Sequence, residues 1–156
     1  MTDLGSERIR DEALLIARIL LAVLFLVFGW GKLTDYSGTV AYMTQVGAPL
    51  PSVAALVAMV IEFFGGIALI LGVWIRPLAV LFAVFCLVSG LIGHRYWTMT
   101  GADYFMNKIN FYKNISLMGG FFLLYVTGAG KYSIDARLGL PGAPPRRDAG
   151  SLNAAG

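Results

Sequence analysis

Four long runs of apolar residues occupy most of this chain, and their lengths decide what it can fold into. The runs cover residues 13–30, 53–75, 78–93 and 115–128. A membrane-spanning helix needs about 20 apolar residues, within a range of about 17–25. The first two runs meet this length, and the last two approach it once their aromatic flanks are counted. Because the chain is 58% hydrophobic and only 13% charged, too little polar surface remains for a soluble helical core. The sequence therefore predicts an all-α, integral membrane four-helix bundle.

The segments that flank the apolar runs differ from them in composition. We predict a polar cytoplasmic N-terminus at residues 1–12 and a transmembrane domain at 13–138. The last segment, 139–156, is rich in Pro, Gly and Ala, so we predict a disordered cytoplasmic tail there. The first apolar run does not end in a small-residue cleavage site, and it is interpreted as a retained helix and not as a signal peptide.

Lysine and arginine are shared unequally between the two sides of the predicted bundle. Four crossings place both chain ends on one side, and that side carries seven of these residues against four on the other. Positive charge favours the cytoplasmic side, so both termini are predicted to be cytoplasmic. The seven are Arg8, Arg10, Arg76, Lys131, Arg137, Arg146 and Arg147, and the four are Lys32, Arg95, Lys108 and Lys113.

Three connections join the predicted helices, and they differ in kind. A tight cytoplasmic turn is predicted at Arg76–Pro77, with Pro77 opening the next helix. Two longer outer loops are predicted at 34–51 and 94–111, and residues 47–51 should break any helix there. The second loop is rich in aromatic side chains, which suit the membrane–water interface as anchors; the alternative is a lid over an outward-facing pocket.

Two ionisable residues, Arg18 and Glu62, lie well inside the apolar runs. A charge at such a place costs about 2.5–3.5 kcal/mol on insertion scales, so these residues are candidates for function. Helical rise places their Cα atoms about 12 Å apart along the membrane normal, with Glu62 near the midplane. A direct ion pair between them is one possibility. The other is that Arg18 extends to the inner headgroups.

The surroundings of Glu62 predict where its side chain points. Small residues precede and follow it at four-residue spacing, at Ala54, Ala58 and Gly66, so this face should pack inside the bundle. Polar residues at the outer helix ends form a rim above it. One interpretation is a folding network in which Arg18 or Lys113 neutralises Glu62. The other is a pocket for the polar headgroup of an apolar molecule such as a quinone. The candidate binding cluster is Arg18, Lys32, Glu62, His94, Asn110, Lys113 and Asn114.

Several kinds of chemistry are excluded or disfavoured by composition. The single cysteine, Cys86, excludes an intrachain disulfide or a dithiol centre and is interpreted as a packing residue. The single histidine, His94, cannot build a histidine-ligated metal site, and no metal is expected. No P-loop, dinucleotide fingerprint or haem-attachment motif is present, so no intrinsic cofactor is expected. The net charge of +3 suits membrane orientation better than nucleic-acid binding.

The same residues resemble those of the DoxX family of small four-helix membrane proteins (DoxX/DoxD-like). The similarity covers about residues 13–138. It depends on Arg18 in the first helix, GWGKL at 29–33, EFFGG at 62–66 and NFYKN at 110–114. The resemblance implies a multi-pass protein of the bacterial inner membrane. The family includes relatives of a membrane subunit of thiosulfate:quinone oxidoreductase, and members linked to redox assemblies.

We therefore expect an accessory or anchoring subunit of a membrane redox assembly, without catalytic activity as a single chain, that binds quinone or lipid near Glu62. One alternative is a small proton-coupled transporter that uses Glu62. Another is a quinone-linked oxidoreductase subunit with a direct catalytic role, using Glu62, His94 and Lys113 as acid–base groups. The expected partners are the lipid bilayer, a redox enzyme subunit and a second copy of the chain, with no nucleic acid.

Overall fold

The computed structural model describes residues 2–140, and every element in that part of the chain is helical. The end of the predicted tail, 141–156, lies outside the described residues. The elements are α1 Thr2–Thr34, α2 Tyr36–Gln45, α3 Pro51–Met59, the π-helix η1 Val60–Gly65, α4 Gly66–Leu71, α5 Ile75–Gly93, the 3₁₀ helix η2 Tyr96–Thr98, α6 Gly101–Thr127 and α7 Ile134–Leu138.

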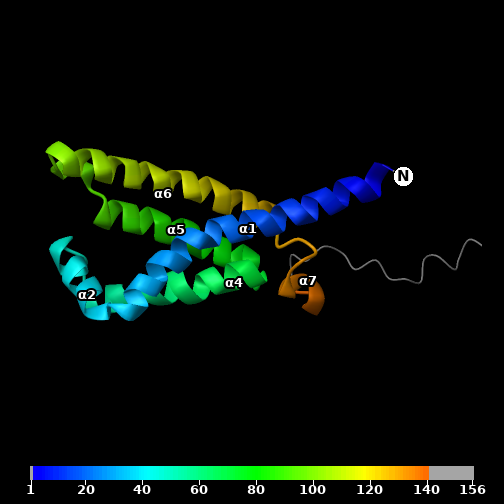
Figure 1. Ribbon diagram of the computed structural model, residues 1–156, viewed down its shortest axis with the longest axis horizontal. Coiled ribbons are helices and arrows are strands. Elements are labelled where there is room, and N and C mark those ends of the chain that lie inside the picture. Colours follow the sequence, from blue (N-terminus) through cyan, green and yellow to red (C-terminus); the bar gives the residue numbers. More distant parts are fainter. Residues whose placement is uncertain (1, 141–156) are drawn as a thin grey trace, which may run out of the picture.

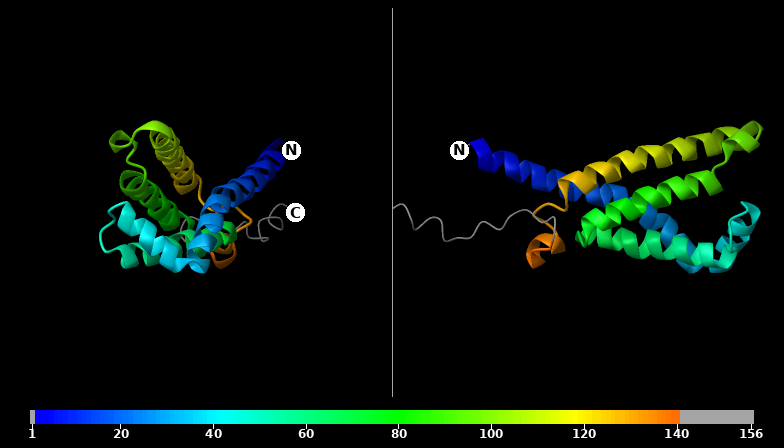
Figure 2. Two further views of the ribbon diagram at one scale, coloured as in Figure 1. Left: turned by 60° about the vertical axis from the view of Figure 1, so that its left-hand side comes forward. Right: turned by 180° about the vertical axis from the view of Figure 1, so that it is seen from behind.

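The long helices form two pairs that meet at one end of the molecule and diverge at the other (Figures 1 and 2). Helix α1 packs along the continuous segment α3–η1–α4, and α5 packs along α6. Helix α1 begins, and α6 ends, at the end where the pairs converge, beside α7. Helix α2 lies at the opposite, open end. The two pairs are thus farthest apart at the end where α2 lies.

Three segments are long and apolar enough to cross a membrane: Glu7–Thr34, Pro51–Leu71 and Ile75–Thr98. The fourth long helix, α6, has 27 residues, but its first half contains charged and amide side chains and does not reach the same hydropathy. The predicted all-α class with four long helices is therefore confirmed, and three of the four meet the criteria for a span.

Three phenylalanines from three helices join the pairs near the middle of the molecule. The Phe82 ring of α5 lies 4.5 Å from Phe25 of α1 and stacks 5.1 Å from Phe121 of α6, between ring centroids. Each such aromatic pair contributes about 0.5–1.5 kcal/mol beyond the area that it buries. Arg18, Ala22, Phe25 and Gly29 follow one another at helical spacing on one face of α1, and all four are buried.

The connections differ from the prediction in two places. The turn before α5 is formed by Gly72–Trp74 and not by Arg76–Pro77, which already lie in the first turn of α5. Gly72 takes the left-handed conformation (φ 70°) that ends α4, and Pro77 fits the first helical turn because its missing N–H is not needed there. The predicted break at residues 47–51 is confirmed, since α3 begins at Pro51.

The predicted outer loops are largely helical. Residues 36–45 form α2, and α6 begins at Gly101, well before its apolar run. Hydropathy alone placed the start of this helix too late, because polar residues such as Asn107 and Lys108 continue it. The aromatic residues of 94–112 pack on one another around Tyr96, whose ring centroid lies 5.2–5.7 Å from those of Trp97, Tyr104 and Phe111.

Candidate functional site: the Glu62 cavity

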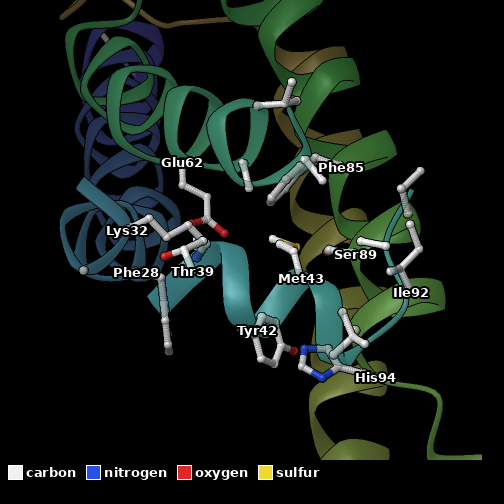
Figure 3. Close-up of a pocket in the computed structure, with 18 of the residues that line it drawn as sticks. Phe28, Lys32, Thr39, Tyr42, Met43, Glu62, Phe85, Ser89, Ile92 and His94 are labelled. Carbon is white, nitrogen blue, oxygen red and sulfur yellow. Dashed lines mark ion pairs between the residues drawn. The ribbon is translucent and has the colours of Figure 1, made fainter. Parts of the chain in front are cut away.

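A cavity of about 780 Å³ lies at the open end of the molecule, between the two helix pairs (Figure 3). We call it the Glu62 cavity. Six of the seven residues of the predicted binding cluster line it: Lys32, Glu62, His94, Asn110, Lys113 and Asn114. They come from α1, η1, α6 and the end of α5, so residues far apart in sequence meet around one space. Arg18 does not line it.

Glu62 pairs with Lys32 and not with Arg18 or Lys113. The Lys32 Nζ atom lies 2.5 Å from Glu62 Oε2. Lys32 stands in the last turn of α1, and Glu62 is 8% exposed in the π-helical turn η1. Such turns are rare and occur often at functional sites, where they redirect a side chain. The carboxylate thus faces the cavity together with its counter-ion.

Close backbone packing brings the two partners together. A Cβ atom on Gly29 would lie 2.6 Å from the backbone nitrogen of Phe63, so only glycine lets α1 approach η1 this closely. Lys32 follows three residues later on α1, and Glu62 is adjacent to Phe63. The backbone contact between α1 and η1 therefore determines the geometry of the ion pair.

Lys113 supplies a second ammonium group near the same place. Its Nζ donates to the Asn110 amide oxygen at 2.9 Å. It lies 5.9 Å from the centre of the Phe28 ring, and Lys32 Nζ lies 5.7 Å from the same centre. Among the described residues, no carboxylate lies within ion-pairing distance of Lys113. The inner end of the cavity therefore contains two cations and one anion.

His94 and Asn114 are held by hydrogen bonds at the cavity wall. Asn114 donates to the Cys86 carbonyl oxygen at 3.2 Å and to Ser89 Oγ at 3.1 Å. His94 Nδ1 lies 3.0 Å from Asn107 Oδ1, and the Asn107 amide nitrogen donates to the Asp103 carbonyl. Because Asn107 uses its amide nitrogen on Asp103, its Oδ1 is the group that faces His94 Nδ1 and can accept from it.

The outer wall of the cavity is provided by α2, which the sequence did not predict. Tyr42 of α2 points toward His94 (Figure 3). Partial burial raises the pKa of the Tyr42 phenol, so it stays a hydrogen-bond donor at neutral pH. The helix is tied down at both ends: Arg95 donates to the Val46 carbonyl at 2.6 Å, and the Tyr36 hydroxyl donates to the Ser52 carbonyl at 2.7 Å. None of the aromatics of 94–112 lines the cavity.

Arg18 lies at the opposite, converging end, and its side chain is fully buried. It does not pair with Glu62, and its side chain does not reach the protein surface. Its guanidinium donates to the Tyr132 carbonyl, lies against Gly72 and interacts electrostatically with Asp135. The Asp135 carboxylate in turn accepts hydrogen bonds from the backbone N–H groups of Trp74 (2.7 Å) and Ile75 (2.9 Å). We call Arg18, Gly72, Tyr132 and Asp135 the Arg18 cluster.

Asp135 was not among the predicted residues, because α7 is only five residues long and follows the last apolar run. A local signal exists. Ser133 two residues before Asp135 fits a helix N-cap, and its Oγ does accept from the Ala136 N–H at 3.1 Å. The local sequence does not indicate that this helix folds back onto the turn between α4 and α5. The carboxylate that acts electrostatically on Arg18 was therefore sought in the wrong helix.

Helices of membrane length and a buried ion pair beside a cavity define a multi-pass integral membrane protein. The chain belongs to the DoxX family, whose sequence profile matches residues 13–95. It is 48% identical over 135 residues to the inner membrane protein YphA of Escherichia coli, covering 86% of this chain and 95% of YphA. It is 39% identical over 135 residues to the inner membrane protein YqjF of the same organism, covering 85% of this chain and 96% of YqjF.

A shorter match, 34% identical over 70 residues, links the chain to the putative oxidoreductase CatD of Bacillus subtilis, covering 45% of this chain and 51% of CatD. No solved structure matches the chain. The inner membrane localisation predicted from the sequence is confirmed by the two E. coli relatives.

Proposed function

We propose that this protein binds a small amphipathic molecule, a quinone or a lipid, in the Glu62 cavity and works as an accessory or anchoring subunit of a membrane redox assembly. The observation that carries the proposal is that six of the seven polar residues predicted as a binding cluster share one cavity. A purely structural network has no need of such a space.

The size and lining of the cavity support this class of ligand. Small-molecule sites are commonly about 300–1,000 Å³, mostly apolar, with a few polar groups that orient the ligand. The Glu62 cavity fits this description at about 780 Å³. Apolar side chains such as Val57, Phe85 and Ile92 line its walls, and the charged groups gather around Phe28. A ring or alkyl chain suits the walls, and a polar headgroup suits the charged end.

We also propose that all four long helices cross the membrane with both termini in the cytoplasm. The excess of Lys and Arg at the converging end supports this orientation. Helix α1 begins and α6 ends at that same end (Figure 1). The Glu62 cavity then opens in the outer half of the membrane, where α2 lies along the interface. The redox part of the proposal is supported by the description of CatD as a putative oxidoreductase.

Native purification tests the proposal directly. The protein is extracted in lipid nanodiscs, and its bound lipids, quinones and partner proteins are identified by mass spectrometry. Val88→Trp places a large ring into the cavity, whereas Val84→Trp, one turn earlier on α5, is the matched control because Val84 does not line it. The two valines are similarly exposed, at 46% and 52%. We expect an enriched amphiphile in the wild type and Val84→Trp, and its loss in Val88→Trp. Equal recovery from all three would refute the proposal.

A proton-coupled carrier is the second candidate, and the π-helical turn at Glu62 favours it. Irregular helix turns within membrane helices commonly line transport sites. Glu62 would then be the titrating group. In liposomes with an imposed pH gradient, wild-type protein should show solute-dependent proton flux and Glu62→Gln should show none. Absence of flux in the wild type would eliminate this candidate.

A further inference from the structure

The charges inside the Glu62 cavity do not balance at its inner end. The Nζ atoms of Lys32 and Lys113 both lie near the Phe28 ring, at 5.7 and 5.9 Å from its centroid. Glu62 neutralises Lys32 at 2.5 Å. Lys113 has the Asn110 amide oxygen at 2.9 Å and, in the described part of the chain, no carboxylate partner. One positive charge therefore remains beside an apolar space.

The remaining ionisable groups around the cavity do not cancel this charge. Asp35 also lines the cavity and keeps its negative charge, because its hydrogen bonds come from neutral donors, the Gly38 N–H at 2.9 Å and Ser37 Oγ at 3.2 Å. In the described part of the chain, however, its carboxylate forms no ion pair with Lys113. His94 and Tyr42 face each other at the outer wall, and Cys86 lies buried behind Asn114. None of these groups places a negative charge at Lys113.

We propose that Lys113 binds the headgroup of an amphipathic monoanion, a carboxylate or a phosphodiester, whose alkyl chain occupies the apolar walls of the cavity. This inference rests on the binding cavity of the proposed function and narrows its ligand to one charge class. A headgroup with one negative charge completes the pairing of two cations with two anions. A cationic amphiphile would be repelled, and an uncharged one would leave Lys113 unpaired in a poorly hydrated space.

The Lys32–Glu62 pair sets the number of negative charges that the site accepts. With Glu62 in place, Lys32 is already neutralised, and only Lys113 is free to hold the headgroup. Glu62→Gln releases Lys32 as a second cation. This change should therefore strengthen binding of anionic amphiphiles, and it should let a dianion such as decyl phosphate bind as well as decanoate. A purely structural role for Glu62 predicts no such gain.

Binding of a matched series of amphiphiles to the protein in nanodiscs tests the inference. Decanoate, decanol and decyltrimethylammonium share one alkyl chain and differ only in headgroup charge, and lysophosphatidylglycerol distinguishes a lipid phosphodiester from a free carboxylate. We expect decanoate or lysophosphatidylglycerol to bind about tenfold tighter than decanol, the value of one charge-assisted hydrogen bond. We expect decyltrimethylammonium to bind weakest.

Lys113→Gln should remove the preference for decanoate over decanol. Lys108→Gln is the control, because Lys108 lies on the same helix over the Tyr104 ring but does not line the cavity. The inference would be overturned if the wild type bound decanoate and decanol equally well, or if Lys113→Gln still preferred decanoate. In either case the proposal that the cavity binds an amphiphile would stand. If no amphiphile binds, or if Val88→Trp binds them all as well as the wild type, the proposed function fails too.

Discussion

Arg18 and Glu62 are both buried charges inside apolar helices, but the two ends of the molecule surround them differently. Arg18 is enclosed completely, by backbone groups of the segment 131–135, Gly72 and the Asp135 carboxylate. Glu62 has one side-chain partner, Lys32, and faces an open space of about 780 Å³. The Arg18 cluster joins three chain segments, α1, the turn at Gly72 and residues 131–135, where the helix pairs converge. The Glu62 cavity lies where the pairs diverge.

This difference shows that an intramembrane charge does not by itself indicate a binding site. At the converging end, Arg18 is fully buried against Gly72 and Tyr132, and its side chain borders no open space. At the open end, a cluster of charged residues borders apolar walls, and one of them, Lys113, has no carboxylate partner among the described residues. What separates the two roles is the free volume beside the charge, and that volume depends on the packing of helices that are distant in sequence.

The largest loss of stability is expected at the Arg18 cluster. Asp135→Asn keeps the shape of the side chain but removes the negative charge beside the buried Arg18 guanidinium and one acceptor for the α5 N-terminus. Breaking a buried charge interaction costs about 3–5 kcal/mol, so we expect unfolding free energy to fall by about 3 kcal/mol. Thermal unfolding in detergent measures this. Asp103→Asn, in the first turn of α6, should shift stability by less than about 1 kcal/mol. Equal effects would show that the cluster does not hold the fold.

A smaller loss is expected from Lys32→Met, which leaves the Glu62 carboxylate buried without its counter-ion. Because the two side chains keep 17% and 11% of their exposure, we expect about 2 kcal/mol, below the usual range for a fully buried pair. The double variant Lys32→Met with Glu62→Gln should recover much of that loss. A double-mutant cycle on unfolding free energies isolates the coupling. If the two single effects simply add, the ion pair contributes nothing to stability.

How much of this contrast the sequence predicts depends on the residue. The apolar runs identify the helices, and helical spacing correctly buries the Glu62 face and gathers Lys32, His94 and Lys113 on one rim. Helix depth counting also shows that Arg18 and Glu62 lie at different levels. The π-turn at Glu62, the fold-back of α7 and the tilt between the helix pairs are absent from the local pattern. These features arise from tertiary packing, so Arg18 was grouped with the wrong cluster.

A moderate effect is expected from Gly29→Ala. The new Cβ meets the backbone of η1 at 2.6 Å, and backbone cannot rotate away, so α1 must shift. Overpacking of this kind costs about 1–3 kcal/mol, and we expect about 1.5 kcal/mol together with a weaker Lys32–Glu62 coupling. Gly31→Ala, whose Cβ meets nothing within 4 Å, should be neutral or slightly stabilising. Identical behaviour of the two variants would contradict the close contact between α1 and η1.

We propose that the Arg18 cluster stabilises the fold and that the Glu62 cavity binds a ligand. The most direct test of this difference is the affinity for decanoate, measured on Lys113→Gln and Asp135→Asn at a temperature where both variants are folded. We expect Lys113→Gln to weaken decanoate binding about tenfold with little change in melting temperature. We expect Asp135→Asn to bind decanoate like the wild type although it melts earlier. Weakened binding in Asp135→Asn, with unchanged binding in Lys113→Gln, would show that the two ends do not have these separate roles.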